Sequence, residues 1–143
     1  MRGVSPEDRI LVAGEALVDL VPAADGTLSP YPGGGPFTTA RALARLGRPV
    51  AFAGRLSTDR FGERMAAMLA ADGVAADATE RTGDPTTLAL AEIDAAGAAT
   101  YRFYTEGTSA PGQAQVHGVE VRRPDINASN GSMSGSIMRE WYA

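Results

Sequence analysis

Two strand-like runs alternate with two helix-like segments, and this order constrains the fold more than any other feature of the sequence. Residues 9–14 (RILVAG) and 49–54 (PVAFAG) are short aliphatic runs ending in glycine, which is typical of buried strands. Apolar residues recur at helical spacing over residues 36–46 and over about 59–72. Because a strand–helix–strand–helix order builds βαβ crossovers, the sequence predicts an α/β domain with a mostly parallel sheet.

The segments between these elements carry turn chemistry. Residues 16–22 (ALVDLVP) continue the first strand or form the next one, and Pro22 ends that run. Residues 24–35 are rich in glycine and proline around a short strand-like piece. Gly47 and Gly73 stand where helices commonly end in glycine, which supports the two predicted helices.

The second half of the chain changes character. Residues 86–94 and 99–105 alternate their side chains and are joined by a short glycine-bearing turn, so they predict an antiparallel β-hairpin. Such a hairpin acts as a lid, forms an interface, or merely covers the edge of the sheet. Residues 112–143 show no sustained period, and we expect a poorly ordered tail after a domain spanning residues 1–111.

Composition narrows the classes of partner and site. The 143 residues, 44% of them hydrophobic, suffice for one domain with a core, and a net charge of −4 argues against nucleic acid or an anionic membrane as a partner. The lack of cysteine excludes disulfides and thiolate nucleophiles, and a single histidine argues against a metal site. Glu15 and Asp19 interrupt the first apolar run, so we expect neither a signal peptide nor a membrane span. We therefore expect a cytoplasmic protein.

Three consecutive glycines precede the first predicted helix. Thr38 stands where a G-x-G-x-x-G dinucleotide motif needs its last glycine, and no lysine follows as in a P-loop, so the loop does not predict a nucleotide site. Backbone exposed by Gly33 and Gly34 equally suits a neutral ligand rich in hydroxyl groups. Asp19 is the best-placed carboxylate to accept hydrogen bonds from neighbouring hydroxyls; the alternative is that it caps a turn.

Taken together, these segments resemble the PfkB/ribokinase family of carbohydrate kinases, and its fructokinase-like members most. The similarity is carried by residues 10–22 (ILVAGEALVDLVP), 33–47 (GGGPFTTARALARLG), 51–74 (AFAGRLSTDRFGERMAAMLAADGV) and 85–111 (PTTLALAEIDAAGAATYRFYTEGTSAP). The resemblance implies the N-terminal portion of a ribokinase-like three-layer α/β/α fold with a β-hairpin lid, truncated before the ATP-binding half. The family reaction is the ATP-dependent phosphorylation of a sugar hydroxyl, with a fructose-like substrate implied here.

The resemblance also implies a set of substrate-binding residues. Asp19 would hold sugar hydroxyls, Gly33 and Gly34 would lie close to the sugar, and the hairpin would close over it to exclude water. On the hairpin, Tyr104 is the candidate for an apolar face against the sugar ring; the alternative is plain hairpin packing. Thr38 matches a position where the family normally has a sugar-contacting asparagine, so one hydroxyl replaces an amide.

A second departure concerns catalysis. The family's aspartate base lies in a Gly-Ala-Gly-Asp segment of the C-terminal half, next to a helix N-terminus that binds the transferred phosphate, and no segment here matches it. We therefore assign no catalytic residue, and we expect the ATP and Mg²⁺ of the full-length family to lack a site in this chain. On this basis we expect the chain alone to be inactive. The alternative is a non-catalytic module that binds a sugar or forms a homodimer through its hairpin.

Overall fold

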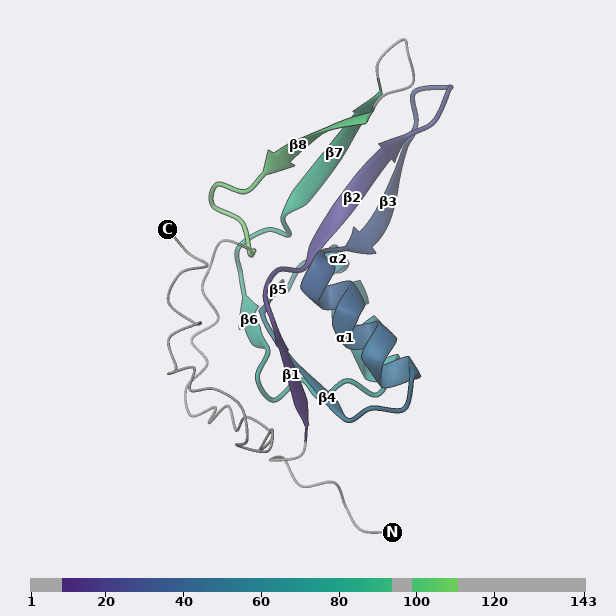
Figure 1. The fold of residues 1–143 in the computed structure, drawn as a ribbon. Helices are drawn as coiled ribbons and strands as arrows, with labels where there is room; N and C mark the ends of the chain where they lie inside the picture. Colours follow the sequence, from purple (N-terminus) through teal and green to yellow (C-terminus); the bar gives the residue numbers. More distant parts are fainter. Residues whose placement is uncertain (1–8, 94–98, 111–143) are drawn as a thin grey trace, which may run out of the picture.

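A computed structural model of the chain describes residues 9–93 and 99–110. Within these residues two helices and eight strands form an α/β body from which one sheet projects (Figure 1). In chain order the elements are β1 (Ile10–Ala13), β2 (Leu17–Pro22), β3 (Leu28–Gly33), α1 (Gly35–Arg45), β4 (Val50–Ala53), β5 (Arg55–Ser57), α2 (Arg60–Ala71), β6 (Glu80–Thr82), β7 (Leu88–Ile93) and β8 (Ala99–Tyr104).

The body is built on parallel strand pairs. β1 pairs with β4 and β5 pairs with β6, both in parallel, which confirms the predicted parallel α/β arrangement. The strands β5 and β6 were not predicted, because each has three residues and β6 carries Glu80 and Arg81. None of the described helices is long and apolar enough to cross a membrane.

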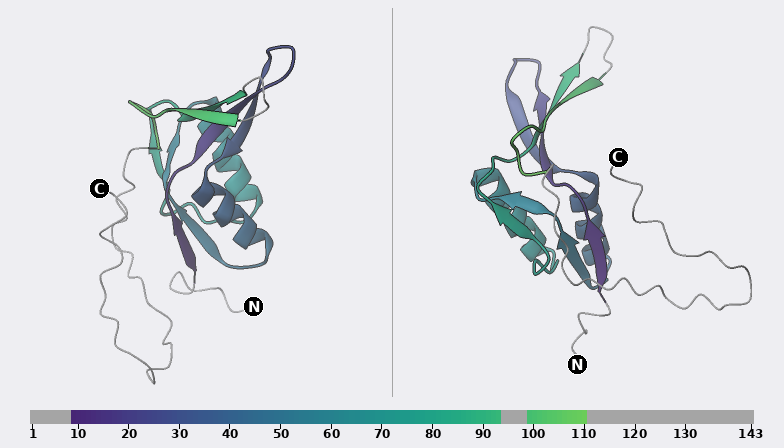
Figure 2. Two further views of the ribbon diagram at one scale, coloured as in Figure 1. Left: turned by 45° about the horizontal axis from the view of Figure 1, so that its top comes forward. Right: turned by 90° about the vertical axis from the view of Figure 1, so that its left-hand side faces the viewer.

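The projecting sheet has the strand order β3-β2-β7-β8. β2 pairs with β3 antiparallel and with β7 in parallel, and β7 pairs with β8 antiparallel, so the predicted hairpin is confirmed. The right-hand view of Figure 2 shows this sheet extending away from the helices. The turn at residues 94–98 and the predicted tail from residue 112 lie outside the described residues.

The first helix begins where the glycine loop ends. Gly34 occupies the N-cap position with φ of 100°, a conformation that glycine adopts without strain, and Pro36 follows in the first turn, where its missing N–H costs nothing. The second helix has a side-chain cap, because a carboxylate oxygen of Asp59 accepts a hydrogen bond from Gly62 N at 2.9 Å. Gly47 and Gly73 follow the helix ends with positive φ, as predicted.

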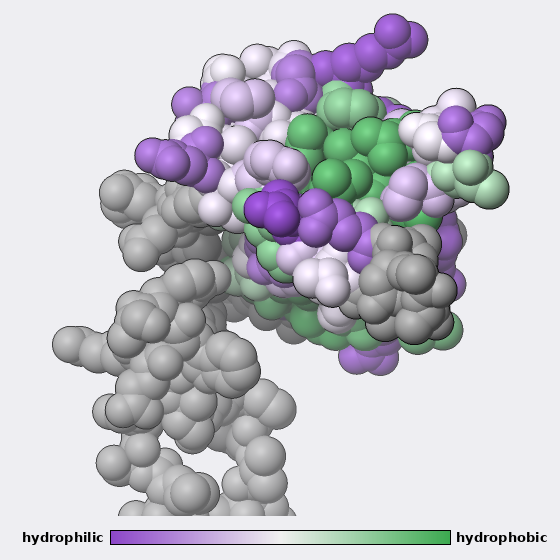
Figure 3. Space-filling model, turned by 90° about the horizontal axis from the view of Figure 1, so that it is seen from above, coloured by the Kyte–Doolittle hydropathy of each residue, from purple (hydrophilic) through white to green (hydrophobic). Residues whose placement is uncertain are grey.

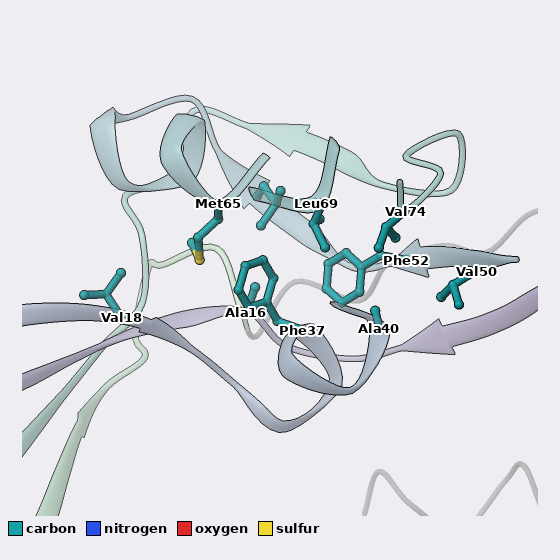
Figure 4. Close-up of a cluster of buried hydrophobic side chains, with 10 residues drawn as sticks. Ala16, Val18, Phe37, Ala40, Val50, Phe52, Met65, Leu69 and Val74 are labelled. Atoms are coloured by element: carbon teal, nitrogen blue, oxygen red, sulfur yellow. The ribbon is translucent and has the colours of Figure 1, made fainter. Parts of the chain in front are cut away.

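Both helices contribute to one hydrophobic core (Figure 4). Phe37 of α1 and Phe52 of β4 are fully buried and meet edge to face, with their ring centroids 6.2 Å apart. Met65 and Leu69 of α2 pack into the same cluster. This core fixes the start of α1, and with it the glycine loop, against the base of the projecting sheet.

Candidate functional site

Asp19 lies in the middle of β2, with a neighbouring strand on each side. Its register partners are Tyr31 on β3 and Ala89 on β7. Partial burial raises the pKa of its carboxyl above the usual value. Since it sits within a strand and accepts no hydrogen bond from the described residues, Asp19 does not cap a turn.

Three other carboxylates with a perturbed pKa differ from Asp19 in that a neighbouring donor lowers their pKa. The Thr27 hydroxyl lowers the pKa of Asp25, the Arg45 guanidinium that of Asp72, and the Arg9 guanidinium that of Asp77. Asp19 alone of these four has a pKa raised by desolvation and no donor among the described residues. A partly desolvated carboxylate without a donor is an acceptor available to a ligand.

Two of the three loop glycines lie close to other parts of the chain. A Cβ atom at Gly33 would stand 2.3 Å from Asp19 Oδ2, and one at Gly34 would stand 2.8 Å from the carbonyl oxygen of Glu15. The bare backbone therefore lets the loop lie directly against the Asp19 carboxylate. Gly33 thus lies against Asp19, whereas Gly34 lies against the backbone of Glu15 and Ala16.

The other two predicted site residues are placed differently. Thr38 is exposed in the first turn of α1, where its backbone N–H donates to the carbonyl oxygen of Gly34 at 3.0 Å. Tyr104 pairs with Leu88, which in turn pairs with Val18. Because side chains alternate along a strand, Tyr104 lies on the sheet face opposite to Asp19.

The face that carries Asp19 holds aromatic residues that the sequence analysis did not select. One row across the sheet runs Tyr31, Asp19, Ala89 and Phe103, with Ala89 fully buried and Phe103 58% exposed. Tyr101 follows on the same face, stacked on Phe103 with a centroid distance of 6.3 Å. The alternation of side chains within the hairpin places Tyr101 and Phe103 on one face. Only the pairing of β2 with β7 shows that Asp19 lies on that same face.

This arrangement combines three features that suit a polyhydroxylated ligand. Asp19 accepts hydrogen bonds, Gly33 opens the backbone beside it, and Phe103 offers an aromatic face two strands away, about 10 Å across the sheet. Ala89, which lies between them in the row, is fully buried. Among the described residues no group of His, Cys, Asp or Glu forms a candidate metal site.

The chain has extensive similarity to known proteins. Residues 7–138 match the pfkB family of carbohydrate kinases, a match that runs past residue 111, where the recognised segments end. A fructokinase of Rhizobium leguminosarum bv. trifolii is 43% identical over 105 residues, which are 70% of this chain and 32% of that protein. An Escherichia coli fructokinase is 46% identical over 66 residues, 46% of this chain and 22% of its own length.

Solved structures agree in fold. The fructokinase of Xylella fastidiosa has a TM-score of 0.67 and 32% identity over 73% of this chain and 34% of its own. The fructokinase of Vibrio cholerae O395 with bound fructose, ADP and calcium has a TM-score of 0.62 and 27% identity, over 73% of this chain and 34% of its own. The fold is thus the α/β fold of ribokinase-like sugar kinases.

The chain belongs to the pfkB family of carbohydrate kinases, which confirms the resemblance found in its sequence. It spans about a third of the length of the fructokinases that it matches.

Proposed function

We propose that this chain is the sugar-binding portion of a fructokinase-like carbohydrate kinase, whose complete form phosphorylates a sugar hydroxyl with ATP. The observation that carries the proposal is the unpartnered Asp19 carboxylate held against Gly33. A carboxylate in this state binds two neighbouring hydroxyls of a sugar through charge-assisted hydrogen bonds. The similarity to fructokinases supports fructose as the first sugar to test.

In this proposal the chain binds and orients the sugar but does not activate its hydroxyl. Deprotonation of the acceptor and stabilisation of the transferred phosphoryl group require a base and an anion site. We assign both to the part of the kinase that this chain lacks, together with the ATP and Mg²⁺ sites. One related structure, the Xylella fastidiosa fructokinase, has bound ATP. The chain alone is accordingly inactive.

Two measurements on the 143-residue chain test these statements. A coupled ADP-release assay with ATP, Mg²⁺ and a panel of hexoses should detect no turnover; turnover would show that a base and a phosphate site exist in this chain. A fructose titration followed by NMR should show binding that Asp19→Asn abolishes. Asp25→Asn is the matched control, because Asp25 is an exposed carboxylate already bonded to Thr27. Equal affinity in both variants would refute the role of Asp19.

The aromatic contact with the sugar is a separate question within the proposal. Tyr104 was selected from the resemblance, whereas the register favours Phe103, which shares the face of Asp19. We propose that Phe103 covers an apolar face of the sugar ring. Phe103→Ala should then weaken fructose binding severalfold more than Tyr104→Ala. The reverse order would return the role to Tyr104.

A second function is supported by the face opposite to Asp19. Tyr104 and Leu28 lie on that face and are each 49% exposed, and half-buried Leu88 and Leu90 lie between their strands. Viewed from above, the surface of the molecule shows hydrophobic residues next to hydrophilic ones (Figure 3). We propose as the alternative function that this face pairs two copies of the chain.

Light scattering after size exclusion tests the alternative. A homodimer through this face should dissociate in Tyr104→Arg and persist in Phe103→Arg, which places the same charge on the other face of the same strand. A monomeric wild-type chain at all concentrations, or a dimer that resists Tyr104→Arg, would refute it.

A further inference from the structure

The N-cap of α2 is joined to the hairpin as well as to its own helix. Asp59 Oδ1 accepts hydrogen bonds from Gly62 N at 2.9 Å and from Thr86 Oγ1 at 2.7 Å. Its other oxygen, Oδ2, accepts from Thr86 N at 2.8 Å. Capping a helix needs only the first of these three bonds. Two of the three therefore hold a segment that lies outside the helix.

Thr86 stands at the root of the hairpin. It is 4% exposed, two residues before β7 begins, and it precedes Thr87, whose carbonyl oxygen accepts from Val18 N at 2.9 Å. A bond made by Thr86 thus acts at the point where the chain passes from the body into the projecting sheet.

The returning end of the hairpin is attached to the same root. The hydroxyls of Thr87 and Thr108 are 2.7 Å apart, and Ala110 N donates to Thr87 Oγ1 at 2.9 Å. Ser109 N donates to the carbonyl oxygen of Pro85 at 2.9 Å. Because the two ends are tied together, whatever holds Thr86 holds both strands of the hairpin.

The pKa of Asp59 agrees with its hydrogen bonds to both α2 and Thr86. Partial burial raises its pKa, but the hydrogen bonds from Gly62, Thr86 and Ser57 outweigh that effect, and the pKa lies below the usual value. The hydrogen bonds thus favour the charged form of Asp59, whereas Asp19 accepts no hydrogen bond from the described residues. Its three bonds connect α2 to the hairpin through a single side chain.

We infer that Asp59 is a positioning residue, which fixes the root of the β7–β8 hairpin against α2 and so sets how the sheet that carries Asp19 and Phe103 is oriented relative to the helices. The part of this inference that concerns the sugar rests on the proposed function. Ala89 is three residues from Thr86, or about 10 Å along the strand, so a rotation of about 10° at Thr86 moves the row that carries Asp19 and Phe103 by about 2 Å relative to the helices. Displacements of about 1 Å already weaken positioned contacts.

Two substitutions separate this role from simple capping. Asp59→Ser keeps a side-chain oxygen for Gly62 N but loses the pair of hydrogen bonds from Thr86 to the two carboxylate oxygens. Thr86→Val leaves the cap intact and removes the hydroxyl donor. Asp72→Ser is the matched control, because Asp72 lies at the other end of α2 and bonds Arg41 and Arg45 at 2.6 and 2.8 Å, not the hairpin.

Amide hydrogen exchange of the full chain is the measurement. In Asp59→Ser and Thr86→Val we expect exchange in β7 and β8 to rise on the order of tenfold, with the first turn of α2 unchanged. Asp72→Ser should leave β7 and β8 unchanged. If exchange rises only in α2, or if Thr86→Val has no effect on the hairpin, Asp59 is only a cap and the inference fails.

A fructose titration of the same variants separates this inference from the proposed function. The exchange result needs no ligand, so it decides the positioning role even if the wild-type chain binds no sugar. If the wild-type chain binds fructose, both variants should weaken binding severalfold while Asp72→Ser does not. Unchanged affinity beside increased hairpin exchange would refute the link between Asp59 and the sugar site.

Discussion

Gly62, in the first turn of α2, offers the sharpest test of how this fold is held together. A Cβ atom at Gly62 would stand 1.9 Å from the carbonyl oxygen of Ser57 and 2.6 Å from its carbonyl carbon. Both atoms belong to the backbone of β5, so no side-chain rotation relieves the clash, and α2 must retreat by roughly 1 Å. That shift would also draw Asp59 away from Thr86.

The expected magnitude follows from two opposing effects. Overpacking of this kind lowers the free energy of unfolding by about 1–3 kcal/mol, whereas replacing glycine by alanine in a helix raises it by up to about 1 kcal/mol. Because the clash is with backbone, we take the upper part of that range, and expect Gly62→Ala to lower the free energy of unfolding by about 2 kcal/mol, or the Tm by about 10 °C.

Thermal and urea unfolding followed by circular dichroism measures the effect. Gly83→Ala is the control, because a Cβ atom at Gly83 would have no neighbour within 4 Å and the residue has no positive φ. The control should be neutral or slightly stabilising. If Gly62→Ala is as stable as Gly83→Ala, then α2 does not rest on the β5 backbone and the reasoning is refuted.

Three further outcomes can be measured on the same chain. Phe37→Ala should cost about 3–5 kcal/mol in urea unfolding, because a fully buried ring is lost from the core; a cost below about 1 kcal/mol would contradict the packing in Figure 4. Thr38→Asn should tighten fructose binding severalfold in an NMR titration, by adding an amide donor and acceptor; unchanged or weaker binding would contradict it. Asp19→Asn should raise the urea midpoint at pH 7, since burial raises the pKa of Asp19 and the charged form costs stability above that pKa; the gain should vanish at a pH where Asp19 is protonated.

Most of the fold could be predicted because its elements have strong local patterns. The helices α1 and α2 repeat apolar residues at helical spacing and are followed by Gly47 and Gly73, both with positive φ. The strand β3 was harder, because Pro30 and Pro32 are unusual in strands. It tolerates both prolines since it is an edge strand that pairs only with β2 in the described sheet.

The candidate site could be predicted in part for a similar reason. Asp19 and Gly33 were selected by residue type and by position after a strand or before a helix, which are local properties. The choice between Tyr104 and Phe103 depends on which hairpin face meets Asp19. That face is set by the parallel register of β2 with β7, which joins segments far apart in the chain and has no local signal.

The contrast between two carboxylates shows why Asp19 points to a ligand. The Asp72 side chain is 12% exposed, and Arg41 and Arg45 both donate hydrogen bonds to it. Asp19 is partly desolvated and has no donor among the described residues, which lowers stability whenever it is charged. Gly33 preserves this situation, because any side chain there would displace the carboxylate. The hydroxyl groups of a sugar would donate the missing hydrogen bonds to Asp19. They would thereby offset the free-energy cost of its partial desolvation.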